Sequence, residues 1–210
     1  NDTWYYLEIE LTRATGTGGS YNIYLSGQSV LSGSGVNTGA AAIETVNFGT
    51  SASGLAFDVD DLYTTNTAAR LGECRVDTLR PNADTAQKQW TPSTGADNFA
   101  CVDEQQANGD ADYVSASTAG ALDLYEMGDL PVTPSTVYAV QTTIFARKDD
   151  AASREVRSKI KSGSSVGAGA AKPLISTYTP LCDVFETDPA TGAAWTAPAV
   201  NAVQAGIEVV

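Results

Sequence analysis

The side chains that could do acid–base chemistry in this chain are carboxylates, because its 210 residues include no histidine. Histidine is the usual general base near neutral pH and the commonest nitrogen ligand of protein-bound metals. Its absence excludes serine or cysteine hydrolysis through a histidine-assisted dyad. A zinc site would have to combine three scattered cysteines with carboxylates, which makes zinc a poor fit.

The tightest acidic group is Asp58, Asp60 and Asp61, and paired carboxylates can hydrolyse a glycosidic bond that they flank. Residues 55–63 are predicted to form a strand, which would place Asp58 and Asp60 on one side and Asp61 on the other. Consecutive acids at a strand end more often cap a turn or bind calcium than form a catalytic pair. The sequence therefore favours a structural role, with a calcium site as the alternative and catalysis as the least favoured reading.

Other motif-like segments give no site. The acidic stretches Asp103-Glu104 and 108–112 lack the full ligand spacing of an EF-hand loop and are predicted to be solvated turns. The glycine-rich stretch 16–19 has no following helix and no P-loop lysine, so phosphate binding has no support.

Half of the basic residues fall between positions 147 and 161. A strand there would place Arg157, Lys159 and Lys161 on one face. Such a stripe could contact an acidic glycan or a neighbouring acidic subunit. The alternative is a solvated edge face whose lysines discourage uncontrolled strand pairing. The six residues are Arg147, Lys148, Arg154, Arg157, Lys159 and Lys161.

Trp90 and Trp195 lie in similar polar, proline-containing surroundings. If exposed, they would suit stacking against sugars. Burial, with each indole anchoring a loop against the fold, is the favoured interpretation.

Composition and charge narrow the function classes. The net charge of −13 makes broad binding to nucleic acid or an anionic membrane unfavourable, and no apolar run approaches the roughly 20 residues that span a bilayer. Cys74, Cys101 and Cys182 have no metal-like spacing. Free buried thiols are expected, and a single bridge between Cys74 and Cys101 is the alternative. No cofactor is expected apart from the calcium alternative.

The first seventy residues predict about five strands and no helix. Residues 3–12 alternate, with Leu7, Ile9 and Leu11 on the face expected to be buried and Glu8 on the other. Glycine-containing turns separate further strands. These are predicted at 21–25, 29–31, 43–48 and 55–63.

Residues 64–70 have no periodicity and are predicted to be a linker. Beyond it, a hairpin is predicted between 136–148 and 154–161, joined by 149–153, and the Gly/Ala-rich stretch 163–171 is predicted to be a loop. The chain is therefore predicted to be all-β, with two sandwich or jelly-roll modules at 1–66 and 71–210. Other strands are predicted at 73–79, 98–102, 111–116, 121–126, 174–178, 181–186 and 205–210.

The chain resembles tailed-bacteriophage virion proteins that carry a laminin-G or concanavalin-like jelly roll followed by a C-terminal β region. The early strands of that jelly roll have no counterpart here, so the first module is expected to be incomplete at its N-terminus. The first part of the resemblance rests on TWYYLEI (3–9), LSGQSVL (25–31) and DDLY (60–63). The second rests on LGECRV (71–76), LRPN (79–82), DYV (112–114), ARKDDA (146–151) and ETDPATGAAWT (186–196).

This resemblance implies a non-enzymatic structural component of a virion, such as a fibre, spike or surface-decoration protein. It would be assembled in the host cytoplasm and displayed on the particle as a symmetric homo-oligomer, a trimer being one option, beside other virion proteins. Contact with host surface polysaccharide is compatible with that role. A carbohydrate-binding module of a secreted or displayed protein is the alternative, and a carboxylate-dependent glycan hydrolase is less favoured.

Overall fold

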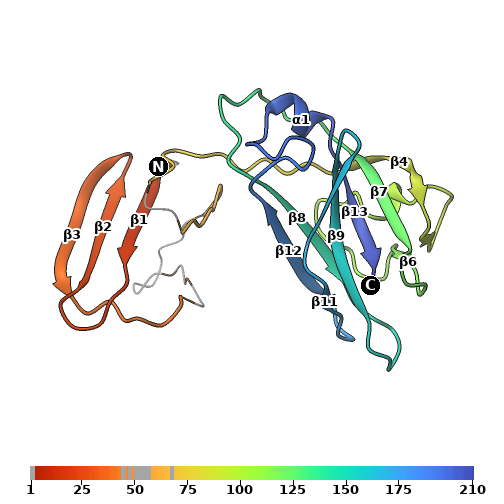
Figure 1. Ribbon diagram of the computed structural model, residues 1–210, viewed down its shortest axis with the longest axis horizontal. Helices are drawn as coiled ribbons and strands as arrows, with labels where there is room; N and C mark the ends of the chain where they lie inside the picture. The colour runs from red at the N-terminus through yellow and green to blue at the C-terminus, as the bar shows by residue number, and fades with distance from the viewer. Residues whose placement is uncertain (1–2, 44–45, 47–48, 50–57, 67–68) are drawn as a thin grey trace. The chain divides into compact units, whose positions relative to one another are not determined.

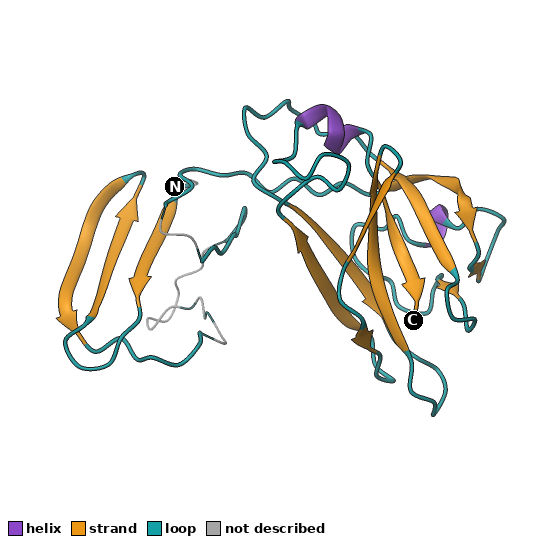
Figure 2. Ribbon diagram, viewed as in Figure 1, coloured by secondary structure: helices purple, strands orange, loops and turns teal. Residues whose placement is uncertain are grey.

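The computed structural model describes residues 3–43, 46, 49, 58–66 and 69–210. It divides into two compact units, Asn1–Asp77 and Thr78–Val210. Their regular secondary structure consists almost entirely of antiparallel strands, so the all-β prediction is confirmed (Figures 1 and 2). The division falls later than the sequence placed it, because Arg70 and Gly72 bond to Glu8 in the first strand. No helix among the described residues has the length and apolarity to cross a membrane.

The first unit is a three-stranded meander of β1 (Leu7–Thr12), β2 (Gly19–Leu25) and β3 (Gln28–Val36). Ser26 and Gly27 join β2 to β3 with φ of 48° and 80°. Positive φ at both positions is the geometry of a two-residue hairpin turn whose twist matches that of the strands. The turn predicted between the strands at 21–25 and 29–31 is confirmed.

The strand β1 alternates as predicted, but the buried side is the opposite of the expected one. Ile9 is 61% exposed, whereas Glu8 is only 7% exposed. The physical reason is that residues from the 63–72 segment bond to Glu8 and so cover the polar side of the sheet. The residues of β2 that pair with Leu7, Ile9 and Leu11, and their partners in β3, lie on the same exposed side of the sheet. We call this surface the apolar face; its exposed residues are Leu7, Ile9, Leu11, Leu25 and Leu31.

Two other strand predictions concern the end of this unit. Residues 58–63 form no strand, so that part of the predicted strand is wrong. Most of the strand predicted at 43–48, and residues 55–57, lie outside the described residues.

The second unit packs a six-stranded sheet and a two-stranded sheet around one core. The larger sheet has the order β10-β9-β13-β7-β4, with β11 also pairing with β9; β12 pairs with β8 and β5 with β6. The strands are β4 (Pro81–Lys88), β5 (Thr91–Pro92), β6 (Val114–Ser115), β7 (Leu122–Met127), β8 (Val140–Ala146), β9 (Glu155–Ser162), β10 (Ser165–Ala168), β11 (Lys172–Pro173), β12 (Thr179–Phe185) and β13 (Gln204–Val209).

The core lies where the two sheets meet the helix α1 (Ala197–Asn201). Ile160 and Trp195 are buried at its centre, and Val140 and Phe185 pack against it from β8 and β12. The indole Nε1 of Trp195 donates to the backbone oxygen of Phe185 at 2.9 Å. Trp195 therefore anchors the loop before α1, which confirms its predicted burial.

The hairpin predicted between 136–148 and 154–161 is wrong in its pairing, although both strands exist. β8 pairs with β12, whereas β9 pairs with β13, β10 and β11. Residues 149–153 form a turn that the Asp150–Arg154 ion pair stabilises. Just before this turn, Lys148 N donates to Ile175 O and not to β9. The link therefore passes from one sheet to the other.

The remaining predictions are mixed. The strands predicted at 121–126, 181–186 and 205–210 are confirmed by β7, β12 and β13. The segment 98–102 contains a 3₁₀ helix (Phe99–Cys101) instead of a strand, because Asp84 accepts the backbone N–H groups that open that turn. Residues 73–79 and 174–178 form no strand, only Val114–Ser115 is strand within 111–116, and the loop predicted at 163–171 contains β10.

The close approach of β13 to β7 gives a testable prediction. A Cβ at Gly206 would lie 2.8 Å from the carbonyl carbon of Asp123 and closer still to its oxygen. Both are backbone atoms that cannot move alone. We expect Gly206→Ala to destabilise the fold by about 2–4 kcal/mol, measured by urea denaturation. Gly128→Ala, which meets nothing nearer than 3.7 Å, is the control, and equal losses in both variants would contradict the prediction.

Candidate functional site

The three predicted calcium ligands do not converge. Asp61 has a φ of 52°, and its backbone N–H donates to Oδ1 of Asp60 at 2.8 Å. Its carboxylate accepts the N–H of Val76 at 2.7 Å. Across the described residues, Asp58, Asp60 and Asp61 included, no three histidine, cysteine, aspartate or glutamate side chains gather to hold a metal. The group has the geometry of a turn.

The basic stripe does lie on one face of β9, but it faces acceptors on β13. Arg157 and Lys159 both pair with Glu208, and Lys161 donates to Gln204 at 3.1 Å. The hydrogen bond from Arg157, together with that from Lys159, holds the pKa of Glu208 below its usual range despite burial. Glu208 therefore offsets one of the three positive charges of the stripe, and Gln204 satisfies a donor of Lys161.

Arg147 belongs to a different cluster at the end of β8. Its Nη2 lies 3.0 Å from Oδ1 of Asp110, and its guanidinium lies 5.3 Å from the ring centre of Tyr178. The Tyr178 hydroxyl donates to the same carboxylate at 2.8 Å, and its ring stacks on Phe145 with centroids 5.2 Å apart. The result is a small, partly exposed aromatic surface backed by an ion pair.

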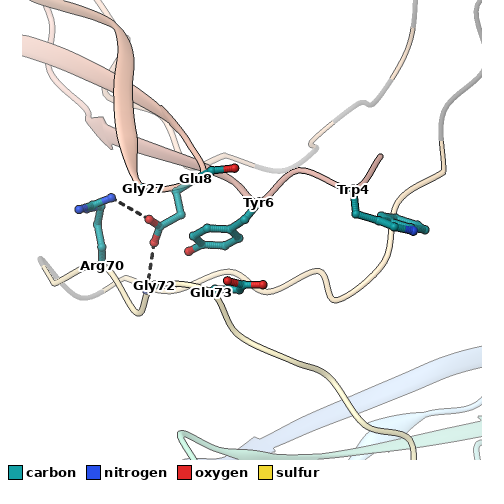
Figure 3. Close-up of a pocket in the computed structure, with 8 residues that line it drawn as sticks. Trp4, Tyr6, Glu8, Gly27, Arg70, Gly72 and Glu73 are labelled. Carbon is teal, nitrogen blue, oxygen red and sulfur yellow. Dashed lines mark hydrogen bonds and ion pairs between the residues drawn. The ribbon is translucent and has the colours of Figure 1, made fainter. Parts of the chain in front are cut away.

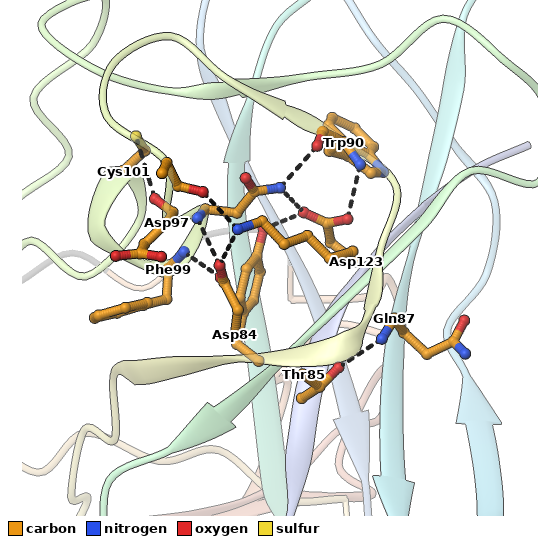
Figure 4. A network of polar contacts seen from close by, with 12 residues as sticks. Asp84, Thr85, Gln87, Trp90, Asp97, Phe99, Cys101 and Asp123 are labelled. Carbon is orange, nitrogen blue, oxygen red and sulfur yellow. Dashed lines mark hydrogen bonds and ion pairs between the residues drawn. The ribbon is translucent and has the colours of Figure 1, made fainter.

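Trp90 is half-buried and belongs to a buried polar network (Figure 4). Its Nε1 donates to Ala121 O at 3.1 Å. The fully buried carboxylate of Asp123 accepts the backbone N–H groups of Gln89 and Trp90, at 2.5 and 2.8 Å. Asn98 Nδ2 and the Tyr125 hydroxyl donate to its other oxygen, at 2.6 and 3.0 Å. Four donors hold this carboxylate in place, so the network fixes the loop after β4.

A second carboxylate completes this network. Asp84 accepts the N–H groups of Asn98 and Phe99, at 2.9 and 2.7 Å, and pairs with Lys88. Burial raises the pKa of Asp84, but the bonds from Lys88 and the two backbone groups outweigh it and lower the pKa overall. The Lys88 ammonium also donates to Ala96 O at 2.6 Å. The exposed Lys88 ammonium thus supplies the positive charge beside the Asp84 carboxylate.

Glu104 and Asp112 form the carboxyl pair that most resembles an acid–base pair. Burial, followed by the hydrogen bond and charge of Asp112, raises the pKa of Glu104. Asn108 Nδ2, however, donates to both carboxyls, at 3.1 Å to Glu104 and closer to Asp112. The two carboxyls therefore interact with each other and share one amide donor.

A hollow of about 310 Å³ lies in the first unit, next to the turn between β2 and β3 (Figure 3). Two of its lining residues are joined by the backbone N–H of Ser26, which donates to Tyr6 O at 2.7 Å. None of its residues was singled out from the sequence as a site. They are Trp4, Tyr6, Glu8, Ser26, Gly27, Arg70, Gly72 and Glu73.

Glu8 forms the charged wall of this hollow. Its carboxylate accepts from the Tyr63 hydroxyl at 2.9 Å, from Arg70 Nη1 at 2.8 Å and from the Gly72 N–H at 3.3 Å. Burial raises the pKa of Glu8, but these bonds, together with that from the Tyr6 hydroxyl, lower it overall. Glu8 is therefore held as a carboxylate and is not available as a general acid.

Arg70 contacts both Glu8 and the polar side of the sheet. Its guanidinium stacks 3.7 Å from the ring centre of Tyr24, whose hydroxyl donates to Glu10 at 2.7 Å. One signal in the sequence could have pointed to this site, namely the aromatic run from Trp4 to Tyr6 before Glu8. Arg70 was missed because it lies in a segment without periodicity.

All three cysteines are free thiols. Cys101 is buried, Cys74 is half-buried and Cys182 is exposed. The expected burial therefore holds for Cys101 and is wrong for Cys182, which points away from the core on the outer side of β12.

Comparison of the chain with protein-family models, with curated proteins and with solved structures finds no match.

The network around Asp123 predicts a large loss of stability when its carboxylate is removed. Asp123→Ala leaves four donors without their acceptor, two of them on the buried residues Asn98 and Tyr125, so we expect the free energy of unfolding to fall by about 3–5 kcal/mol. Exposed Asp129→Ala should change it by less than about 0.5 kcal/mol. Urea denaturation of both variants checks this, and a loss below about 1 kcal/mol for Asp123→Ala would contradict it.

The lowered carboxyl pKa values predict acid sensitivity of the second unit. At Asp183, burial raises the pKa, but bonds from Lys172 and Ser158 lower it further than burial raises it. A folded-state pKa below the unfolded value stabilises above about pH 4, and this stabilisation is lost as pH falls through the folded value. Urea denaturation at pH 7 and pH 3 should therefore show lower stability at pH 3. Asp183→Asn should reduce this difference; an unchanged difference would contradict the assignment.

Proposed function

We propose that this chain is a non-enzymatic structural component of a bacteriophage virion and assembles with further copies of itself through the apolar face. The observation that carries the proposal is the exposure of that face, where five aliphatic side chains lie uncovered on one sheet. Contiguous exposed apolar surfaces of this kind mark sites of protein association.

The chemistry of the face favours a second copy as the occupant. Its five residues carry no charge, although the chain has a net charge of −13. Two copies repel each other through their net charge, and a contact made by uncharged residues adds no pair of like charges to that repulsion. A two-fold pairing would bury on the order of 1,000 Å², which reaches the size of a specific interface.

The carboxylates support a structural role over hydrolysis. Glu8, Asp84, Asp123 and Asp183 each accept several hydrogen bonds. A glycosidase needs a general acid with a raised pKa across a groove from a second carboxylate. The virion setting itself rests on the resemblance of the sequence segments, and identifying the neighbouring chains in an intact particle tests it.

Oligomeric state tests the role of the apolar face. The full chain should be oligomeric at micromolar concentration by analytical ultracentrifugation, and Ile9→Glu should dissociate it because a carboxylate cannot be buried unpaired. Ile175, 54% exposed in the second unit, provides the matched control Ile175→Glu, which should leave the mass unchanged. A monomeric wild type, or an oligomer that survives Ile9→Glu, would refute this interface.

A further inference from the structure

The hollow beside Glu8 combines the features of a small-ligand site. Its volume of about 310 Å³ lies at the lower end of the range for ligand pockets, roughly 300–1,000 Å³. It also combines aromatic, hydroxyl and charged side chains, so it offers both an apolar surface and directional hydrogen bonds. A single sugar ring is of a size that fits.

The hollow has an exposed aromatic surface. Trp4 is 67% exposed, and both Trp4 and Tyr6 line the hollow. Figure 3 shows the ring of Tyr6 beside Glu8, with Trp4 farther out along the same segment. The C–H bonds on one face of a pyranose carry slight positive charge and pack against the negative face of an aromatic ring.

Polar groups lie around this aromatic surface. The exposed carboxylate of Glu73 can accept from sugar hydroxyls, and the hydroxyl of Ser26 can donate or accept. The guanidinium of Arg70 carries five N–H donors, and its ion pair with Glu8 engages Nη1. The Glu8 contacts and the stacking on Tyr24 hold that guanidinium in a fixed position.

Charge selects among the ligands that an aromatic hollow could hold. Glu8 and Glu73 against Arg70 leave one net negative charge, and the whole chain is acidic. An anionic sugar would be repelled by Glu73, whereas an ammonium ligand would be repelled by Arg70 but attracted by the two carboxylates. An uncharged ring with hydroxyl groups suits this lining because hydroxyls can both donate to the carboxylates and accept from the guanidinium, whereas an ammonium group can only donate.

We propose that this hollow binds an uncharged pyranose sugar, which stacks on Trp4 and hydrogen-bonds to Glu73. The site gives the chain a glycan-binding activity besides assembly. It lies on the polar side of the β1–β3 sheet, whereas assembly uses the apolar face, so the two activities use opposite sides of one sheet.

The test titrates the full chain with methyl α-D-glucopyranoside, methyl β-D-galactopyranoside and N-acetyl-D-glucosamine. Binding is followed by saturation-transfer NMR and indole fluorescence, with N-acetylneuraminic acid and choline as anionic and cationic comparisons. At least one neutral sugar should bind with a Kd of about 1–10 mM, and both charged probes should bind at least tenfold more weakly.

Matched variants locate the binding. Trp4→Ala should weaken binding of the sugar at least tenfold, and its indole exposure means that the fold is retained. Tyr5→Ala, an adjacent aromatic that is 63% exposed and outside the hollow, should leave binding unchanged. Glu73→Gln should weaken binding of the neutral sugar. It should also reduce the ratio between the affinity for the neutral sugar and that for N-acetylneuraminic acid.

Three outcomes would overturn the sugar site: no binding of any neutral sugar, binding that Trp4→Ala leaves unchanged, or tighter binding of a charged probe. None of them bears on the apolar face, because Trp4→Ala leaves that face intact and the oligomer mass is measured separately. Conversely, a monomeric chain that still binds the sugar would refute assembly through the apolar face and would support the sugar site.

Discussion

Burial of carboxylates is the constraint on which both units depend. A buried carboxylate costs several kcal/mol unless donors surround it, so each one dictates the course of the backbone that supplies those donors. In the first unit Glu8 accepts hydrogen bonds from Arg70 and from the N–H of Gly72, which lie more than sixty residues away in the sequence. In the second unit Asp123 fixes the backbone at Gln89 and Trp90. Segments without regular secondary structure are thereby held against the sheets.

This use of carboxylates has a consequence for function. An acid that already accepts several hydrogen bonds has its pKa lowered, as at Glu8 and Asp84, and a lowered pKa is the opposite of what a general acid needs. These two carboxylates thus act as structural acceptors. The two surfaces proposed for interaction, the apolar face and the hollow beside Glu8, instead present aliphatic and aromatic side chains.

The same constraint explains why the first sheet exposes aliphatic residues. A three-stranded sheet has two faces, and the segment that neutralises Glu8 covers the polar one. The opposite face, with Leu7 and Ile9, stays uncovered within the described residues. Association through the apolar face and sugar binding beside Glu8 are therefore compatible, because the pleat of β1 sends alternate side chains to opposite sides.

Local signals in the sequence determined the all-β class, the β2–β3 hairpin and the strands β7, β12 and β13, because alternation and turn residues act between near neighbours. The sequence also placed Arg157, Lys159 and Lys161 on one face. Only the tertiary structure decided which face of β1 is buried, because that depends on Arg70 and Gly72, which are distant in sequence. It likewise decided that β8 and β9 enter different sheets. Strand pairing and the burial of charge are settled by partners far along the chain, and no local pattern encodes them.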